Sequence, residues 1–213
     1  IRRRAIDAHA SQNRAVTAQD YSSIIYRMPP KFGAVKRVAI AQDKDSIKRN
    51  INIYTTSEAT NGTLIQTNKT VKENIKYWIN QYKMINDTID ILDARIVNIK
   101  IKFSVKASQD FNKFEVLERA KDALAEYIAD YQFDIGEPLY ITNMYNVLKR
   151  TIGVDDVLKV QVTQSFGSEY SNTTFNVKDN TSHDGRLIFV PEDVILEVKY
   201  TDSDIIGVVS WWQ

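Results

Sequence analysis

The stretch RIVNIKIKFSV, residues 95–105, constrains the fold of this 213-residue chain more than any other feature. Apolar and polar side chains alternate strictly through most of it. Successive side chains of a β-strand point to opposite faces of the sheet, so the pattern predicts a strand with one buried and one solvated face. Such a strand belongs to an antiparallel or mixed sheet that is covered on one side. The apolar positions are Val97, Ile99, Ile101, Phe103 and Val105, and the polar positions are Asn98, Lys100, Lys102 and Ser104.

The stretch RAVTAQDY, residues 14–21, predicts the start of a helix. Thr17 is a suitable N-cap residue, and Asp20, three residues later, completes an approximate capping box. The valine before Thr17 and the tyrosine after Asp20 take the positions of a hydrophobic staple. We expect the helix over residues 18–27, because the proline pair that follows disfavours helical backbone in the residue before it.

Three further helices are expected from similar start signals and from apolar residues spaced three and four apart. The first opens with a capping box formed by Thr70 and Glu73. The other two are expected over residues 112–131 and 143–151. Gly153 is a suitable residue to end the last of them, because glycine readily adopts left-handed backbone.

Shorter strands are expected between the helices, over residues 35–41, 50–54, 157–163 and 194–200. Helix, two strands and helix are then followed by strand, two helices and two or more strands. This order predicts an α+β fold of two consecutive small α/β sandwich units, with mainly antiparallel or mixed sheets and helices packed on one face.

The same order sets the expected domain boundaries. The first unit should span residues 1–90 and the second residues 91–213, joined near residues 87–93. The segment 164–186 is long for a connection inside a small unit, and loops of that length are usually functional or mobile. Residues 173–177 could supply an additional strand within it.

The residue types needed for catalysis are sparse. The absence of cysteine excludes disulfides and thiolate metal sites. His9 and His183 are too far apart in sequence to indicate a zinc site, which needs three or four ligands. The run Ser182-His183-Asp184 is better explained as a turn before Gly185, since triads are assembled from separate segments.

The glycines form no phosphate-binding motif either. We therefore expect no catalytic, cofactor-binding or metal-binding residues, no cofactor, and a protein that is not an enzyme. An enzyme whose active site is assembled from distant segments is kept as an alternative, after the structural subunit and the nucleic-acid-associated protein considered below. No apolar run approaches the roughly 20 residues that cross a bilayer, so no membrane partner is expected.

Charge is distributed unevenly along the chain, although the net charge is only +1. Residues 1–106 contain 19 Lys and Arg against 9 Asp and Glu, whereas residues 107–213 contain 9 against 18. This asymmetry favours packing of one half against the other or head-to-tail contacts between copies. The basic first half also leaves a nucleic-acid-associated protein as an alternative, although no nucleic-acid-binding motif accompanies it.

The expected helices carry charged stripes. Five acidic residues share one face of the helix over 112–131, and four lysines share a face of the preceding helix and its end. They are Glu115, Glu118, Asp122, Glu126 and Asp130, and Lys69, Lys72, Lys76 and Lys83. The simpler interpretation is two solvated surfaces. The sharper hypothesis is that the acidic stripe contacts a basic surface of a neighbouring subunit.

Interface candidates follow from this hypothesis. Glu118, Asp122 and Glu126 are the acidic candidates. Aromatic side chains commonly anchor protein interfaces, which adds Phe32, Trp211 and Trp212, although the two tryptophans could equally fold back onto the core.

The sequence QNRAVTAQDYSSIIYRMPPKFGAVKRVAI resembles a segment of the J-like baseplate wedge proteins of contractile-tailed phages, in which a similar helix start precedes a proline/glycine turn and a strand. A second segment, IGEPLYITNMYNVLKRTIGVDDVLKV, is similar to the family's glycine, short helix and following strand. Together the matches cover residues 12–163. The matching residues are Arg14, Ala15, Val16, Thr17, Asp20, Tyr21, Pro30, Gly33, Lys36 and Val38, and then Gly136, Leu148, Gly153, Val154 and Val157.

The stretch MPPKFGAVKR most resembles the larger wedge subunit of myovirus baseplates. The resemblance implies a structural component of the virion tail baseplate, synthesised in the host cytoplasm, with no cofactor. It implies small α/β domains from the family's C-terminal region that pair with another copy and link wedges into a ring around the tail hub. Expected partners are another copy of the chain and other wedge and hub-proximal proteins, with nucleic acid unexpected. The family's N-terminal half is expected to be missing here.

Overall fold

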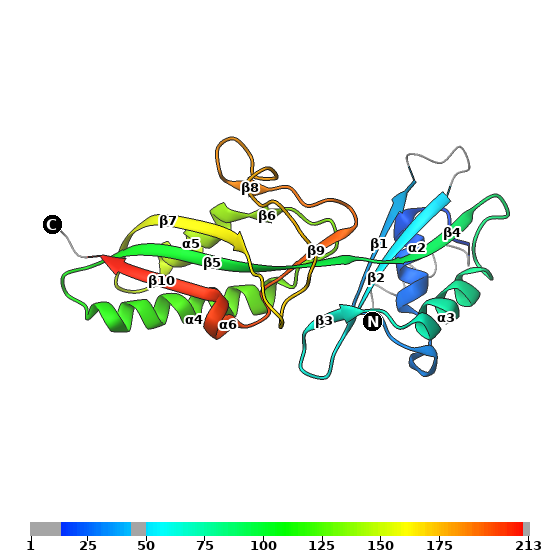
Figure 1. Cartoon of the computed structure of the whole chain (residues 1–213), viewed down its shortest axis with the longest axis horizontal. Coiled ribbons are helices and arrows are strands. Elements are labelled where there is room, and N and C mark those ends of the chain that lie inside the picture. The colour runs from blue at the N-terminus through cyan, green and yellow to red at the C-terminus, as the bar shows by residue number, and fades with distance from the viewer. Residues whose placement is uncertain (1–13, 44–49, 211–213) are drawn as a thin grey trace. The chain divides into compact units, whose positions relative to one another are not determined.

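Strands and helices are mixed along the whole chain, which has the α+β fold that the sequence predicts (Figure 1). The computed structural model describes residues 14–43 and 50–210. These residues divide into two units. The first contains the described residues up to Arg95 together with Asp134–Gly136, and the second contains Ile96–Phe133 and the described residues from Glu137 onward.

The first unit is a mixed sheet with two helices packed on it. Strand β2 runs antiparallel to β1 and β3 and parallel to β4. Helix α2 packs on β1, α3 packs on β4, and the two helices contact each other. The strands are β1 (Arg37–Gln42), β2 (Asn50–Glu58), β3 (Leu64–Gln66) and β4 (Thr88–Asp93), and the helices are α2 (Ala18–Tyr26), the 3-10 helix η1 (Pro30–Phe32) and α3 (Lys69–Ile79).

The core of this unit lies between the helices and the sheet. Burial of each large aliphatic side chain contributes about 1.5–3 kcal/mol, so this cluster is the main source of the unit's stability. Its fully or almost fully buried members include Tyr21, Ile24, Ile25, Ile53, Ile75, Ile79 and Ile89.

The predicted start of α2 is confirmed. The Asp20 amide donates to Thr17 Oγ1 at 3.2 Å, and the Thr17 amide donates to Asp20 Oδ2 at 2.9 Å, so both halves of the capping box are present. Val16 is 64% exposed, however, so a staple contact with buried Tyr21 can hide little of the valine. Polar capping therefore fixes this helix start more than apolar packing does.

The predicted capping box of α3 is wrong. The helix begins two residues earlier than that box requires, and its N-cap is Asn68, whose side chain accepts a hydrogen bond of 3.1 Å from the Thr70 amide. The Glu73 carboxylate instead lies 4.0 Å from Lys69 Nζ. Asparagine is among the strongest N-cap residues, which explains why it displaces the threonine two positions later.

Residues 88–93, where the sequence analysis placed the join between units, form β4 of the first unit. In the parallel register, Ile89 pairs with Ile51 and Ile91 pairs with Ile53. All four side chains belong to or pack against the core of the unit. The apolar positions of this acidic-looking segment therefore continue the first sheet.

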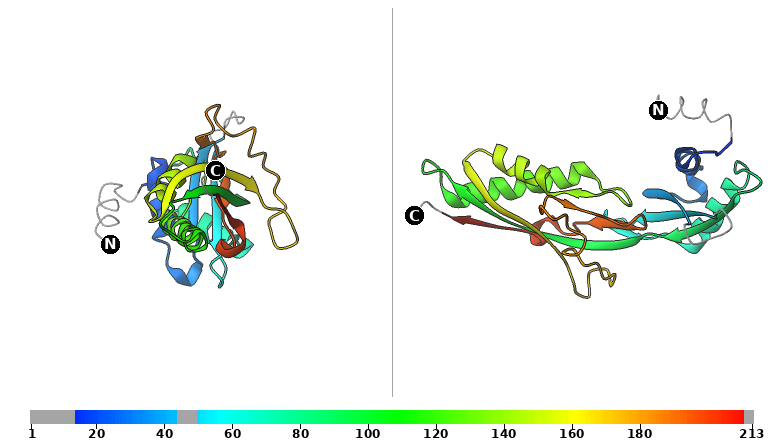
Figure 2. Two further views of the ribbon diagram at one scale, coloured as in Figure 1. Left: turned by 90° about the vertical axis from the view of Figure 1, so that its left-hand side faces the viewer. Right: turned by 90° about the horizontal axis from the view of Figure 1, so that it is seen from above.

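The second unit also has a mixed sheet with helices on one face. Strand β5 is central, antiparallel to β7 and parallel to β10, and β9 also pairs with β5. Helix α4 packs on β10, α5 packs on β7, and both helices lie on the same side of the sheet (Figure 2, right). The strands of this sheet are β5 (Arg95–Ala107), β7 (Val154–Gln164), β9 (Val194–Glu197) and β10 (Ile205–Ser210), and the helices are α4 (Lys113–Tyr131), α5 (Ile141–Arg150) and α6 (Thr201–Asp204). Strands β6 (Leu139–Tyr140) and β8 (Leu187–Ile188) form a separate antiparallel pair.

Strand β5 confirms the predicted alternation over most of its length. From Ile99 to Ala107 every second side chain is buried, and the intervening side chains are half-buried or exposed. The first part differs, because Asn98 was expected on the solvated face but is only 2% exposed. A later segment of the chain covers this end of the strand.

That covering segment lies within the long connection 164–186. The possible strand over 173–177 is absent; these residues have no regular secondary structure. Instead the Gln164 side chain forms hydrogen bonds with the backbone of this segment, as a neighbouring strand would. Its Oε1 accepts a hydrogen bond of 2.9 Å from the Phe175 amide, and its Nε2 donates to the Thr173 carbonyl.

Candidate interaction surfaces

The acidic residues of α4 share one exposed face of the helix, as predicted. The opposite face of α4 is buried and consists of Val116, Ala120, Leu124 and Ile128. We define the acidic helix face by Glu115, Glu118, Asp122, Glu126 and Asp130, all of which are exposed.

Only part of this negative charge is neutralised by α4 itself. Glu115 pairs with Arg119 at 2.5 Å, and Glu118 lies 3.9 Å from Lys121. Asp122, Glu126 and Asp130 form no ion pair with any residue in the described part of the chain. The face therefore presents at least three uncompensated carboxylates to solvent.

The side of the second sheet that faces away from α4 and α5 carries lysines. In the strand register, Lys102 of β5 lies opposite Gln161 of β7 and Ile206 of β10. Opposite residues of paired strands point to the same face of the sheet. We define the lysine sheet face by Lys102, Ser104, Lys159, Gln161, Ile206 and Val208.

The lysine sheet face is open at its centre and closed at one end. Lys102 and Lys159 are exposed, and neither forms an ion pair with a described residue. At the closed end, Lys100 Nζ lies 5.5 Å from the centre of the Tyr170 ring. Beyond the open centre, Lys106 lies opposite Asp156. The second unit thus has a basic side and an acidic side, separated by its own sheet and helix layers.

The lysines of α3 are partly neutralised within the first unit. Lys72 Nζ lies 2.8 Å from Asp93, and Lys76 Nζ lies 4.0 Å from Asp90, both on β4. Lys83 Nζ donates a hydrogen bond of 2.8 Å to the Asp87 carbonyl. Lys72 and Lys83 are therefore engaged within the unit, whereas Lys69 and Lys76 are more exposed and lie 4.0 Å from Glu73 and Asp90.

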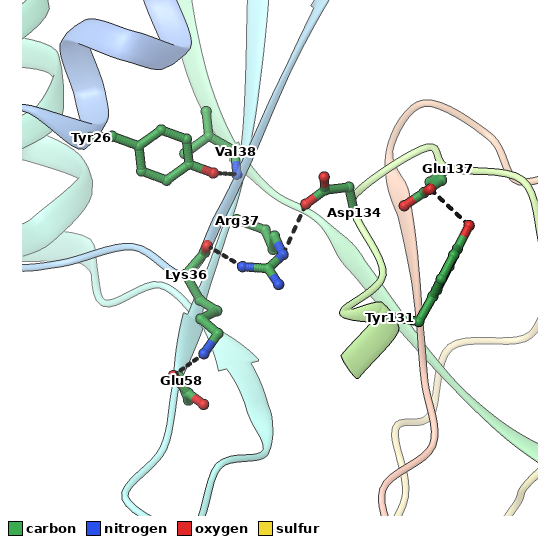
Figure 3. A network of polar contacts seen from close by, with 8 residues as sticks. All are labelled: Tyr26, Lys36, Arg37, Val38, Glu58, Tyr131, Asp134 and Glu137. Atoms are coloured by element: carbon green, nitrogen blue, oxygen red, sulfur yellow. Dashed lines mark hydrogen bonds and ion pairs between the residues drawn. The ribbon is translucent and has the colours of Figure 1, made fainter. Parts of the chain in front are cut away.

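Other basic residues of the first half are also paired, as Figure 3 shows for two of them. Lys36 Nζ lies 2.7 Å from Glu58, and Arg37 Nε lies 2.8 Å from Asp134, which is counted with the first unit. A nucleic-acid surface needs cations that are free to contact phosphates. Lys36 and Arg37 are therefore not free to contact phosphates, whereas Arg14 and Lys31 are exposed and form no ion pair with a described residue, and the arginines at positions 2–4 lie outside the described residues.

The aromatic and the acidic interface candidates come from different parts of the chain. Phe32 lies in η1 of the first unit, is 40% exposed, and has Lys31 Nζ at 4.9 Å from its ring centre. Its carbonyl accepts a hydrogen bond of 2.8 Å from the Asn74 side chain. Glu118, Asp122 and Glu126 belong to the second unit. Trp211 and Trp212 lie outside the described residues.

Sequence reasoning missed the buried polar residues that hold the segment after β7. The Asn98 carbonyl accepts a hydrogen bond of 2.9 Å from the Ser165 amide, and its side-chain oxygen accepts one of 2.7 Å from the Ser171 amide. Its side-chain nitrogen donates to Glu197 at 2.7 Å. An asparagine among buried apolar neighbours could have signalled this role, because buried polar groups are almost always hydrogen-bonded.

A second anchor of the same segment is Asp204, which is fully buried. Its carboxylate accepts hydrogen bonds from the Tyr170 hydroxyl at 2.8 Å and from the Tyr200 amide at 3.1 Å. Lys100 Nζ lies 3.7 Å away. The hydrogen bond to Asp204, with a smaller effect of burial, raises the pKa of the Tyr170 hydroxyl. No local pattern marks Asp204, because two of its partners, Tyr170 and Lys100, come from distant segments.

An open groove of about 1050 Å³ runs along β7 and the segment 174–188. Its lining includes Val160, Val162, Phe175 and His183 but no carboxylate. A pair of carboxylates for acid–base catalysis is therefore not among the side chains that line it. The described residues also contain no group of three His, Cys, Asp or Glu side chains that could hold a metal ion, and no helix among them is long and apolar enough to cross a membrane.

The run 182–184 is a turn, as predicted. Ser182 Oγ donates to Asp184 at 2.5 Å and accepts hydrogen bonds from two later amides. The Gly185 amide donates to the Ser182 carbonyl at 2.8 Å, which closes the turn. The serine hydroxyl is thus directed at Asp184 and the backbone, and His183 takes no part in these bonds.

Comparison with known proteins gives a match of fold but none of sequence. No protein-family model matches the chain, and no curated protein matches it. Among solved structures, it is similar to a chain in the cryo-EM structure of the baseplate of the anti-feeding prophage, symmetrised six-fold, with a TM-score of 0.56 and 12% sequence identity. The fold is shared with a baseplate chain. The similarity covers 93% of this chain and 40% of that one, so this chain spans less than half the length of the protein it matches.

Proposed function

We propose that this chain is a structural part of the baseplate of a contractile tail, where it makes contacts between protein subunits. The observation that carries the proposal is the shared fold with a chain of the anti-feeding prophage baseplate over 93% of the present chain. Both units take part in that similarity. The sequence resemblance of residues 12–163 to baseplate wedge proteins supports the same role independently of the fold.

In finer terms, we infer a wedge subunit whose two α+β units contact another copy and link neighbouring wedges into a ring around the tail hub. Other wedge and hub-proximal proteins would be its remaining partners. The exposed charge of the acidic helix face and the lysine sheet face suits such contacts, because complementary charge directs association and fixes its register. The chain would act in the virion tail, after synthesis in the host cytoplasm.

The proposed role is not enzymatic and needs no cofactor. It depends on surfaces, and the exposed charged residues lie on regular elements, α4 and β5, whose opposite faces are buried. Elements anchored in this way hold contact residues at fixed spacings.

A deletion experiment in the particle that encodes the chain tests this proposal. We expect deletion to yield tails without a complete baseplate in negative-stain electron microscopy, and expression of the chain from a plasmid to restore the baseplate. A plasmid that carries an early stop codon in the same gene is the control. Complete baseplates in particles that lack the chain would contradict the proposal.

A further inference from the structure

We propose that the acidic helix face of one copy docks on the lysine sheet face of a second copy, so that second units associate head to tail. This inference deepens the proposed function, since it rests on the self-association included there. It commits to a second copy as the partner because both complementary surfaces belong to the same unit. They lie on opposite sides of that unit, the helices covering the sheet face that points away from the lysines.

Charge complementarity is the first argument. The acidic helix face contributes Asp122 and Glu126, which no described cation neutralises, and Glu118, whose lysine partner is 3.9 Å away. The lysine sheet face contributes Lys102 and Lys159, which are exposed. Opposing charges are present beside both surfaces: Arg119 and Lys121 pair with Glu115 and Glu118 on α4, and Asp156 lies opposite Lys106. The excess charge on each side is therefore opposite in sign.

The spacing of the charges also matches. Residues four apart on a helix lie one above the other at intervals of about 6 Å, which applies to Glu118, Asp122 and Glu126. In the sheet, Lys159 lies opposite Ser104, which makes it the diagonal neighbour of Lys102 across the strand pair. Diagonal neighbours are about 7–8 Å apart. Two carboxylates one helical turn apart can therefore each face one lysine ammonium group.

Each surface adds apolar area next to its charges. Ile206 and Val208 on the lysine sheet face are 40% and 59% exposed. Phe114, four residues before Glu118 on the same line of α4, is 67% exposed. Apolar side chains at the centre of an interface contribute most of its free energy, and charges around them set its orientation. Phe114 packed against the β10 side chains would supply that centre.

The symmetry of such a contact has a structural consequence. Docking one surface on a different surface of the next copy is a heterologous contact, which continues from copy to copy and produces either closed rings or open filaments. A ring of subunits around a central axis requires contacts of this kind. The inferred contact thus provides a physical basis for ring closure without any additional chain.

Charge reversal of each surface in the full-length purified chain tests the inference by sedimentation at low salt. One variant carries Glu118→Lys, Asp122→Lys and Glu126→Lys, and the other carries Lys102→Glu and Lys159→Glu. Each variant alone places like charges at the contact, so we expect its association constant to fall at least about tenfold. An equal mixture of the two should recover association, because each variant then meets a complementary face of the other.

A variant with Lys69→Glu and Lys76→Glu is the matched control. It changes net charge as much as the lysine-face variant does, at exposed positions of α3 in the first unit, and should associate like the wild-type chain. Circular dichroism checks that all variants fold. Unchanged association of either reversed variant, failure of the mixture to recover, or a wild-type chain that stays monomeric would each overturn the docking inference. The deletion experiment would still decide the baseplate role separately.

Discussion

The hydroxyl of Tyr170 donates a hydrogen bond of 2.8 Å to Oδ1 of Asp204, a buried carboxylate 34 residues further along the chain. This bond fastens the irregular segment after β7 to the start of β10. Replacement of Tyr170 by phenylalanine keeps the ring and removes the bond. We expect the variant to lose about 1–3 kcal/mol in the free energy of unfolding, because a buried acceptor loses a partner.

Hydrogen exchange is the most specific measurement for this variant. Amides of residues 165–175 should exchange faster in Tyr170→Phe than in the wild-type chain, while amides of α2 should be unchanged. Tyr200→Phe is the matched control, since it removes a hydroxyl from the ring that packs edge-on against Tyr170. Equal effects of the two substitutions would contradict the role assigned to the Tyr170 hydroxyl.

Three tyrosines link stability to alkaline pH. Burial, together with a hydrogen bond to Asp87, raises the pKa of Tyr21, and burial with a hydrogen bond to Glu137 raises the pKa of Tyr131. The pKa of Tyr170 is raised by its bond to Asp204. A group with a raised pKa in the folded state stabilises that state fully below its unfolded pKa, about 10 for tyrosine, and less as pH rises beyond it.

We therefore expect the free energy of unfolding to fall as pH rises above about 10. The effect should be smaller in Tyr21→Phe, which has no ionisable hydroxyl at that site. Chemical denaturation at several alkaline pH values, with phenolate absorbance followed in parallel, measures both quantities. An equally steep fall in the variant would show that Tyr21 does not contribute.

Gly33 allows a test of the turn that follows η1. Its φ is +110°, and a Cβ atom at this position would lie 2.6 Å from a methyl carbon of Val71. We expect Gly33→Ala to cost about 1–3 kcal/mol in the free energy of unfolding, from backbone strain and this overlap together. Gly62→Ala is a matched control, because Gly62 also has a positive φ of +83° but its nearest neighbour would be 3.9 Å away.

The difference between the two glycine variants isolates the contact with Val71. Adding Val71→Ala to Gly33→Ala should recover part of the lost stability, as it removes the overlapping methyl groups. If Gly33→Ala proved no more destabilising than Gly62→Ala, close packing of the turn on α3 would not be the reason that glycine occupies position 33.

The N-cap of α3 distinguishes the observed helix start from the one predicted. Asn68→Ala should cost about 1 kcal/mol in the free energy of unfolding, whereas Glu73→Ala should change it by less than about 0.5 kcal/mol. Thermal or urea denaturation measures both variants. A larger loss in Glu73→Ala than in Asn68→Ala would favour the capping box of Thr70 and Glu73 that the structure lacks.

Local signals predicted the parts of the fold that depend on neighbours in sequence. Thr17 and Asp20 define the start of α2, and the alternation around Ile101 defines β5. Strand β10 was missed because its pairing with β5 is parallel and joins residues about a hundred positions apart. Strand β4 was missed because the order of the elements placed the join between the units near residues 87–93, and its parallel partner β2 lies more than thirty residues earlier in the chain.

The candidate surfaces were predictable to different extents. The acidic helix face follows from three- and four-residue spacing within one helix, so Glu118, Asp122 and Glu126 could be grouped from sequence alone. The lysine sheet face could not, since Lys102, Lys159 and Val208 come together only through the pairing of three strands. The burial of Asn98 likewise depends on a segment that returns from beyond β7.

Cryo-electron microscopy of the tail in the particle that encodes this chain is the most direct test of its assigned role. We expect to find the two α+β units in the baseplate density, in repeated copies around the tail axis and in contact with neighbouring subunits. A map in which every baseplate component is identified and this chain is absent would contradict the proposed role.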